Sequence, residues 1–506
     1  MARIRLPDLA AVLLLIVTSA CTVGPDYVKP KVDAPASYKE IEGWKKAEPR
    51  DHVPRGTWWI VYNDTQLNGL EEQVNISNQN VKTAEAQFRE ALALVQAARA
   101  AYFPTVTAGP TVSRTRQSAR SPGAVGSSIS STSPGSVSAS LVNSDYSFDG
   151  AVTWQLDLWG KVRRQVESSK ASAQASAADL EGVRLSAQAL LAQNYFQLRT
   201  LDSQTKVLSD TVAAYRKFLE LTKNRYATGV AAQSDVQTAV TQLETTEAQL
   251  IALGVQRAQM EHAIAILMGK APSELTIPPS PLDGPPPEVP AGVPSELLER
   301  RPDIAAAERQ AAAANAQIGV AIAAYYPTLT LSATGGFQAA TAAQWFTWPA
   351  RFWTLGPGVL QQTLFDGGLR GAQTEEARAA YDASAATYRQ TVLAGFQQVE
   401  DNLAALRILE QQAQAQDAAV NSSIRNLDIT INHYKAGTAS ALDVITTQTI
   451  LLSNQLTAVG ILGGRMNASV LLVDALGGGW CTTDLPSDCY VGQRHYKGCF
   501  DLLDPR

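Results

Sequence analysis

The fold is decided by residues 301–337, which read RPDIAAAERQAAAANAQIGVAIAAYYPTLTLSATGGF. The first part of this stretch is rich in alanine and has no glycine before Gly319, a composition typical of a helix. After Pro327, the apolar residues Leu329 and Leu331 alternate with threonine and serine, which is the two-residue period of a strand. The stretch therefore predicts a helix that changes into a strand at a proline.

The same transition occurs much earlier in the chain, where Ala-Tyr-Phe precedes Pro104 and alternating threonines follow it. A second pair of similar segments lies further along each half. The motif at Tyr226 and Gly229 recurs as Tyr434 and Gly437, 208 positions later. Two pairs of matching segments in the same order indicate an internal duplication at the scale of a domain.

The long helices expected in each half follow from the spacing of the prolines. None occurs between Pro134 and Pro272, and none between Pro357 and Pro486. A helix of about 65 residues would be roughly 100 Å long at 1.5 Å per residue, which indicates a coiled coil or a long bundle. Each long helix breaks once, and in the first half Gly229 is the expected C-terminal cap, with Ser234 or Asp235 as the next N-cap.

Each half contains two predicted strands with an apolar and a polar face. The clearest alternation covers residues 146–158. It fits a strand of an outer-membrane barrel with a wet lumen, or a half-buried strand of a soluble sheet, and alternation alone does not separate the two. In the barrel interpretation, Pro104 and Pro327 mark the joints between helix and strand. The expected lipid-facing residues are Tyr146, Phe148, Val152, Trp154, Leu156, Leu329, Leu331, Phe337, Trp353 and Leu355.

Counting strands predicts an oligomer. One chain supplies four candidate membrane strands, whereas the smallest bacterial barrels have eight. An open sheet cannot expose its edges to lipid, because unpaired backbone groups have no water to bind there. Four strands therefore close only by association of several copies, with the helical hairpins forming a tube beside the barrel.

The N-terminus resembles a bacterial lipoprotein signal. Arg3 and Arg5 form a basic region, residues 10–17 form an apolar core too short to span a bilayer, and small residues precede Cys21. Cys21 is then the lipidated first residue of the mature chain. The alternative is an ordinary secretory signal followed by an incidental cysteine.

These features divide the chain into six parts. They are a signal peptide at 1–20, an extended proline-containing arm at 21–57, a first repeat at 58–271, a proline-rich connector at 272–294, a second repeat at 295–480, and a cysteine-containing tail at 481–506. Cys481, Cys489 and Cys499 lie together in the tail, where one disulfide and one remaining thiol are expected in an oxidising periplasm.

Composition argues against several functions. The 506 residues are 45% hydrophobic and 18% charged, with a net charge of −5, and no basic stripe indicates nucleic-acid binding. The four histidines have no metal-ligand spacing, and no phosphate loop or nucleophile motif is present. We therefore expect no enzyme activity, no cofactor and no metal.

Several segments resemble those of TolC-like outer-membrane efflux proteins, in the lipoprotein branch that includes the NodT and OprM types. They read CTVGPDY from Cys21, RPDIAAAERQ from Arg301, ANAQIGV from Ala314, LFDGG from Leu364 and ALGGGW from Ala475. The resemblance covers nearly the whole chain after Cys21. It implies a homotrimer with a twelve-stranded barrel in the outer membrane above a periplasmic helical tunnel. The partners would be a periplasmic adaptor and an inner-membrane pump that expels drugs or small toxic compounds.

The resemblance also implies that the two hairpin turns form the periplasmic tip, which docks the adaptor and gates the tunnel. The matching positions are Tyr226, Gly229, Ser234, Asp235, Val236, Tyr434, Gly437, Ser440, Asp443 and Val444. The alternative is that the glycines and aspartates only cap helices. Some family members carry an acidic residue one turn beyond the position of Asp443, where this chain has Thr446 and Thr447.

Three further alternatives remain open from the sequence. The duct could carry secreted polypeptides, which would need the same shell. The protein could also be a structural coiled-coil lipoprotein without a pore, although such a protein has no use for the alternating strands. Finally, Tyr325 and Tyr326 fit either an aromatic girdle at the membrane interface or packing at the seam between barrel and tunnel.

Overall fold

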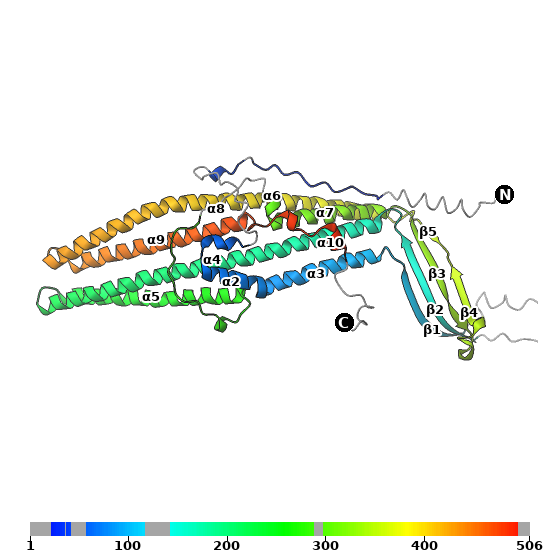
Figure 1. Ribbon diagram of the computed structural model, residues 1–506, viewed down its shortest axis with the longest axis horizontal. Coiled ribbons are helices and arrows are strands. Elements are labelled where there is room, and N and C mark those ends of the chain that lie inside the picture. The colour runs from blue at the N-terminus through cyan, green and yellow to red at the C-terminus, as the bar shows by residue number, and fades with distance from the viewer. Residues whose placement is uncertain (1–21, 36, 42–56, 117–141, 288–296, 494–506) are drawn as a thin grey trace, which may run out of the picture.

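The protein is elongated, with long helices at one end and a sheet at the other (Figure 1). The computed structural model describes residues 22–35, 37–41, 57–116, 142–287 and 297–493. Two helical hairpins turn at the end far from the sheet, and the strands lie at an angle to the helices (Figure 1).

Two very long helices run almost the full length of the helical part. They are α4 (Lys161–Ala227), with 67 residues, and α8 (Leu369–Ala436), with 68 residues, so each is about 100 Å long. Each packs against two shorter helices placed one after the other. The shorter helices are α3 (Gln79–Ala100) and α5 (Gln233–Leu267) along α4, and α7 (Pro302–Ala323) and α9 (Ala441–Ala475) along α8.

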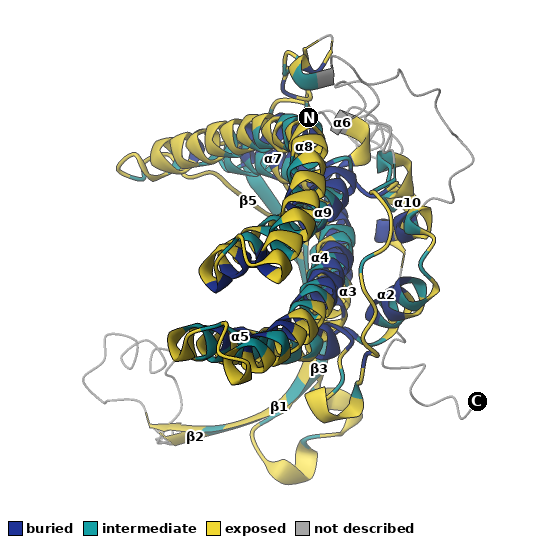
Figure 2. Cartoon of the chain, turned by 90° about the vertical axis from the view of Figure 1, so that its left-hand side faces the viewer, coloured by how far each residue is buried: buried dark blue, intermediate teal, exposed yellow. Residues whose placement is uncertain are grey.

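The helices form one curved layer. Near the tips, contacts give the order α5, α4, α9, α8, and near the sheet they give α3, α4, α7, α8. Viewed from the tips, these helices follow an arc (Figure 2). Within the described chain the arc does not close, because α5 or α3 lies at one edge and α8 at the other.

Alanines allow α4 and α7 to pack closely. Buried alanines of the two helices meet in two small clusters: Ala171 of α4 with Ala312 and Ala313 of α7, and Ala178 of α4 with Ala305 and Ala306 of α7. Small side chains bring two helix backbones near each other, so the alanine-rich composition that predicts these helices also explains how they pack. α7 is preceded by the short helix α6 (Leu297–Arg300).

The main core lies midway along the helices. It is covered by η2 (Trp58–Tyr62) and α2 (Thr65–Ser77), with Trp59 and Leu67 fully buried. The helical segment from residue 65 to residue 100 is broken at Asn78. The Asn78 side chain accepts the N–H groups of Asn80 and Val81 and donates to the Leu267 carbonyl, so α3 starts afresh there.

Glu71 is buried in this core, and neither of its carboxylate oxygens has a hydrogen-bond partner. Burial raises the pKa of Glu71 well above its usual value. The folded state therefore holds this proton more tightly than the unfolded state, so the free-energy cost of burying Glu71 grows as pH rises above the ordinary glutamate pKa.

Glu71→Gln should raise the melting temperature at pH 7.5, whereas exposed Glu72→Gln should not. Equal shifts in the two variants would contradict this account.

The strands form one antiparallel sheet in the order β1, β2, β3, β4. Their bounds are β1 (Thr105–Arg116), β2 (Val142–Leu156), β3 (Thr328–Ala339), β4 (Arg351–Leu355) and β5 (Val359–Gln361). β4 and β5 both pair with β3 and are two segments of the predicted fourth strand. Pro357 lies between them and has no N–H to donate to the ladder.

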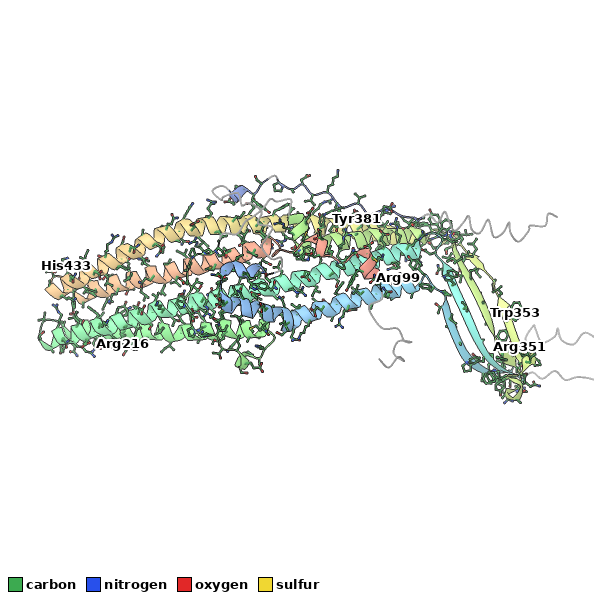
Figure 3. All side chains as sticks on the ribbon, viewed as in Figure 1. Arg99, Arg216, Arg351, Trp353, Tyr381 and His433 are labelled. Carbon is green, nitrogen blue, oxygen red and sulfur yellow. The ribbon has the colours of Figure 1, made fainter. Side chains whose placement is uncertain are left out.

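The register gathers the apolar strand residues on one face. Phe337 lies opposite Phe148, Leu331 opposite Trp154, and Leu355 opposite Ala333 on the next strand. All ten residues expected to face lipid therefore share a face of the sheet. Trp353 and Leu355 on β4 are 80% and 81% exposed, and Figure 3 shows Trp353 on the edge strand. Val359 differs, because it lies opposite Thr330 on the polar face.

Both helix-to-strand transitions occur at the prolines. Pro104 lies between the end of α3 and the start of β1, and Pro327 lies between α7 and β3. Trp159 stacks on Tyr326 with ring centroids 4.9 Å apart, and its indole N–H donates to the Pro327 carbonyl at 2.8 Å. Tyr326 thus has a packing contact at the seam between helices and strands, although both tyrosines remain partly exposed, Tyr326 at 38% and Tyr325 at 43%.

The N-terminal arm is extended and lies along the helices as far as residue 35 (Figure 1). The Val23 N–H donates to the Trp159 carbonyl at 3.2 Å, and the Tyr27 hydroxyl donates to Glu308 at 2.6 Å. Gly24 lies against Gly319, where an added Cβ would be 2.5 Å from the Gly319 Cα. The start of the described chain is therefore fixed at the joint with the sheet.

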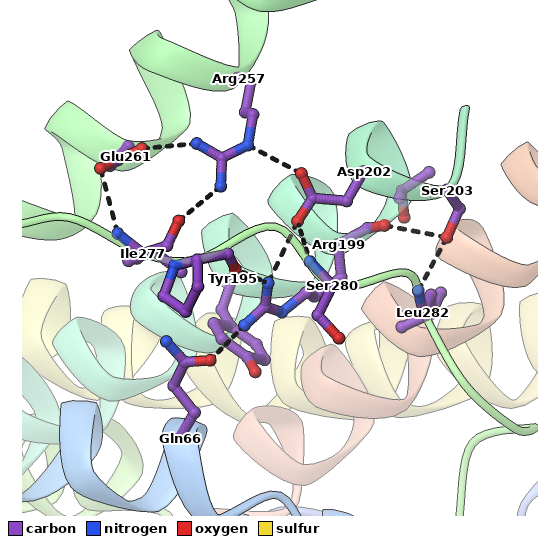
Figure 4. A network of polar contacts seen from close by, with 12 residues as sticks. Gln66, Tyr195, Arg199, Asp202, Ser203, Arg257, Glu261, Ile277, Ser280 and Leu282 are labelled. Atoms are coloured by element: carbon purple, nitrogen blue, oxygen red, sulfur yellow. Dashed lines mark hydrogen bonds and ion pairs between the residues drawn. The ribbon is translucent and has the colours of Figure 1, made fainter. Parts of the chain in front are cut away.

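The connector between the repeats docks on the first repeat (Figure 4). Asp202 on α4 binds Arg199 at 3.1 Å and Arg257 of α5 at 2.8 Å, and it accepts the Ser280 N–H at 3.0 Å. Arg257 also donates to the Ile277 carbonyl at 2.6 Å. One buried carboxylate therefore joins two helices and the connector.

α9 is long and apolar enough, by composition, to cross a membrane, but it packs along α8 and α4. In the tail, Cys481 and Cys489 are not joined to each other, and Cys499, the third candidate for the expected disulfide, lies outside the described residues. The short helix α10 (Asp488–Gly492) packs against α3 and α4.

Candidate functional site: the hairpin tips

The second tip joins α8 to α9 through a glycine turn. α8 ends at Ala436, and Gly437 follows with φ of +80°, a backbone conformation that favours glycine. The Gly437 N–H donates to the Tyr434 carbonyl at 3.0 Å, and the Thr438 N–H donates to the His433 carbonyl at 2.9 Å. These bonds satisfy the last carbonyls of α8 and fix the direction of the turn.

Ser440 and Asp443 form a capping box at the start of α9. The Asp443 N–H donates to the Ser440 hydroxyl at 3.2 Å, and the Ser440 N–H donates to the Asp443 carboxylate at 2.8 Å. The Ser440 hydroxyl and N–H hold the pKa of Asp443 below its usual value. In this tip both predicted residues therefore have a capping role.

The first tip has the same turn but a different cap. Gly229 has φ of +75°, and its N–H donates to the Tyr226 carbonyl at 2.9 Å. The expected N-cap of α5, Ser234 or Asp235, is wrong, because the helix begins at Gln233 and Ala232 is the N-cap. Asp235 lies three residues later and accepts the Ala232 N–H at 3.2 Å. Alanine has no side-chain acceptor, so only half of a capping box is present.

The two tips differ most in their tyrosines. Tyr434 is 3% exposed, whereas Tyr226, at the equivalent position of the first repeat, is 47% exposed. Val444 is fully buried, while Val236 is only partly buried. Residues that the sequence pairs by repeat therefore have different surroundings in the folded chain.

Tyr434 is held by the first hairpin. Its ring lies 5.3 Å from that of Phe218, and the Arg225 guanidinium lies 4.6 Å over its face. Arg225 also donates to the Tyr434 carbonyl at 2.6 Å, and the hydroxyls of Tyr434 and Thr222 are 3.4 Å apart. These contacts tie the end of α8 to α4.

The sequence did not identify Phe218, Thr222 or Arg225 as functional residues. They lie on one side of α4 in the two turns before Tyr226, a spacing that predicts a packed face. That spacing does not say which distant helix the face contacts. The Tyr434 contact therefore becomes visible only in the folded chain.

A groove of about 550 Å³ lies beside the second tip, on α8 and α9. Figure 3 shows His433 close to the end of this hairpin. The lining includes Thr430, His433, Leu442, Asp443, Thr446 and Thr447. Among the described residues, no group of three or more histidine, cysteine, aspartate or glutamate side chains could hold a metal ion. The tips therefore offer helix caps and packing surfaces.

Comparison with known proteins identifies the family. The family model described as "Outer membrane efflux protein" matches residues 70–270 and 293–478, which correspond to the two repeats. The chain belongs to the outer membrane efflux protein family. It is 30% identical to the pyoverdine export outer membrane protein OpmQ of Pseudomonas aeruginosa, over 94% of this chain and 97% of that protein. It is 28% identical to the toluene efflux pump outer membrane protein TtgC of Pseudomonas putida, over 93% and 95%.

Solved structures agree with this assignment. The outer-membrane channel OprN is 31% identical, with a TM-score of 0.81, over 91% of this chain and 100% of that one. The Campylobacter jejuni CmeC channel shares the fold, with a TM-score of 0.83 at 21% identity. The protein is thus an outer-membrane efflux channel with the TolC-like fold, of a family that is not enzymatic. The structural lipoprotein without a pore is ruled out.

Proposed function

We propose that three copies of this efflux protein form a twelve-stranded barrel that continues into a helical tunnel. The open sheet carries this proposal. Among the described strands, β1 pairs only with β2, and β4 and β5 pair only with β3, so both edges of the sheet are open. The helical layer is also open at α5 and α8. Association of copies edge to edge closes both layers at once.

The two faces of the sheet suit lipid outside and water inside. The shared apolar face carries the ten residues listed above, and its aromatic rings extend into the turn after β3. The ring centroids of Trp345 and Tyr146 are 5.7 Å apart, and those of Phe346 and Phe148 are 6.1 Å apart. The opposite face is polar and includes Asp145, which accepts from Gln338 at 3.0 Å. We assign the apolar face to the outer membrane.

The mass of the assembly tests this proposal. Native mass spectrometry of the detergent-purified protein should give three copies of the mature chain. A monomer that stays folded and shows no larger species would contradict the closed barrel. The same sample should bind no nucleic acid.

The tips then face the periplasm, where we propose that they dock the adaptor of an inner-membrane pump. Their outer surfaces are exposed and polar, with Ser234 at the first tip and Ser440 and Asp443 at the second. A duct conducts passively, so the pump supplies the driving force. Relatives named for pyoverdine export and for toluene efflux favour a small-molecule cargo.

The contact at Tyr434 is proposed to keep the tunnel shut at its periplasmic end. Tyr434→Ala should raise the open probability of the channel by about tenfold or more, because truncating a buried aromatic costs about 3–5 kcal/mol and each 1.4 kcal/mol is a factor of ten. Efflux-deficient cells expressing it should also take up large antibiotics faster. Tyr434→Phe, which keeps the ring at the same position, is a matched control. An unchanged channel in the Tyr434 variant would contradict the gating role.

We also propose that Cys21 carries a lipid anchor. Cys21 lies outside the described residues, but the adjoining Thr22 lies against Gly160, at the joint between helices and strands. An acyl chain attached there would be next to the membrane boundary of the barrel. Cys21→Ala should abolish labelling by radioactive palmitate. Continued labelling of this variant would contradict the anchor, and Cys489→Ala, in the tail, is the control that should keep full labelling.

A further inference from the structure

At the first tip Tyr226 is exposed, and beside the second tip there is an open groove. We propose that Tyr226 of one copy inserts into the groove beside the second tip of its neighbour. The inference rests on the proposed trimer and adds which residues meet at the tip. It starts from the internal duplication, which gives each residue of the first hairpin a counterpart 208 positions later.

The contact already observed within one chain supplies the template. Tyr434 packs against Thr222 and Arg225 on α4, in a cluster that also contains Ala239 of α5. The counterparts of these three residues are Thr430, His433 and Thr447. All three line the groove of about 550 Å³. The groove is thus the second-repeat equivalent of the site that buries Tyr434.

The counterpart of the buried ring is Tyr226. It is 47% exposed, and among the described residues its side chain makes no hydrogen bond, ring stacking or cation–π contact. Ala239 is buried by the second hairpin, whereas its counterpart Thr447 still borders open space. The chain therefore contains both an exposed tyrosine and an open groove that matches the site of Tyr434. Tyr226 belongs to the hairpin at one edge of the helical layer, and the groove belongs to the hairpin at the other edge.

The order of the helices places these halves together when copies associate. Within one chain, α4 of the first hairpin lies beside α9 of the second. Continuing the same order brings α8 of one copy beside α5 of the next. Tyr226 on α4 of the second copy then approaches α8 and α9 of the first, as Tyr434 approaches α4 and α5. A second copy of this chain is accordingly the occupant that the groove fits.

The contact between copies is weaker than the contact within a copy. The counterpart of Phe218 is Asn426, so one aromatic neighbour is lost. The counterpart of Arg225 is His433, so the guanidinium that lies over Tyr434 is also replaced. When the tips separate, the joints between copies should therefore part first, and full opening also requires the Tyr434 joint within each copy to part.

Photocrosslinking of the purified full-length protein tests the proposal. Tyr226→p-benzoylphenylalanine should give covalent dimers and trimers on denaturing gels, with crosslinks that map by mass spectrometry to residues 426–447. Tyr434→p-benzoylphenylalanine is the matched control and should link only within its own chain, to residues 218–239. His433→Arg should restore the missing guanidinium and lower the open probability of the channel.

Native mass spectrometry of the same samples separates the possible failures. A trimer whose Tyr226 probe links only within its own chain, or not at all, would overturn this contact and leave the assembly standing. A monomer would overturn both. Crosslinks between copies from the Tyr434 position instead would show that the two hairpins alternate in a different order.

Discussion

Asp202→Ala is expected to lower the free energy of unfolding by about 3–5 kcal/mol, because it leaves buried positive charge without its partner. The Asp202 side chain is 3% exposed and binds both Arg199 and Arg257. It also accepts the N–H of Ser280, so its loss frees the connector from α4. The large effect follows from one carboxylate serving three elements of the first repeat (Figure 4).

The thermal midpoint of the detergent-purified protein and its amount in the outer membrane measure this effect. Asp210→Ala is the matched control, since Asp210 is an exposed residue of the same helix. It should change the free energy of unfolding by less than about 0.5 kcal/mol. Equal shifts for Asp202→Ala and Asp210→Ala would show that the network adds no stability.

Gly477→Ala is the second substitution with a large expected effect. Gly477 has φ of +88°, and an added Cβ would lie 1.9 Å from the Arg300 carbonyl oxygen. The left-handed backbone alone costs an alanine roughly 1–3 kcal/mol, and the clash adds to that cost. Arg301 donates to the Ala475 carbonyl at 2.9 Å beside this turn, so displacing it also loosens α9 from the start of α7.

Little folded Gly477→Ala protein should reach the outer membrane, as measured by quantitative immunoblotting of membrane fractions. Gly254→Ala is its control. Gly254 lies inside α5, and an added Cβ would meet nothing within 4 Å. There alanine should be neutral or stabilise by up to about 1 kcal/mol, because it favours helix. Normal levels of Gly477→Ala would contradict the close approach at the end of α9.

Local patterns were enough to predict the elements and their duplication, and the resemblance of several segments to a known family predicted the family. The change of period at Pro327 gave the order of helix and strand, and its repetition at Pro104 gave the duplication. The alternation through Phe148 and Trp154 gave one face of the sheet, because the period of two fixes which side chains share a face. Proline-free runs gave the length of α4 and α8.

Contacts between distant segments were not predictable in the same way. Tyr226 and Tyr434 occupy the same position in two similar local motifs, yet one is exposed and the other buried, because only the second faces a hairpin of its own chain. The break at Asn78 depends partly on a carbonyl of α5, far along the chain. The cap at Ala232 was missed because side-chain preference points to Ser234 or Asp235, whereas the turn geometry starts the helix earlier.

We propose that this protein forms a duct which its hairpin tips hold closed. Single-channel recording of the purified trimer in planar lipid bilayers tests it most directly, with the wild type and Tyr434→Ala compared under the same conditions. We expect the wild type to be closed most of the time, and the variant to open far more often to one reproducible conductance. The account would be contradicted if neither protein conducted, or if the wild type were already fully open and the variant no different.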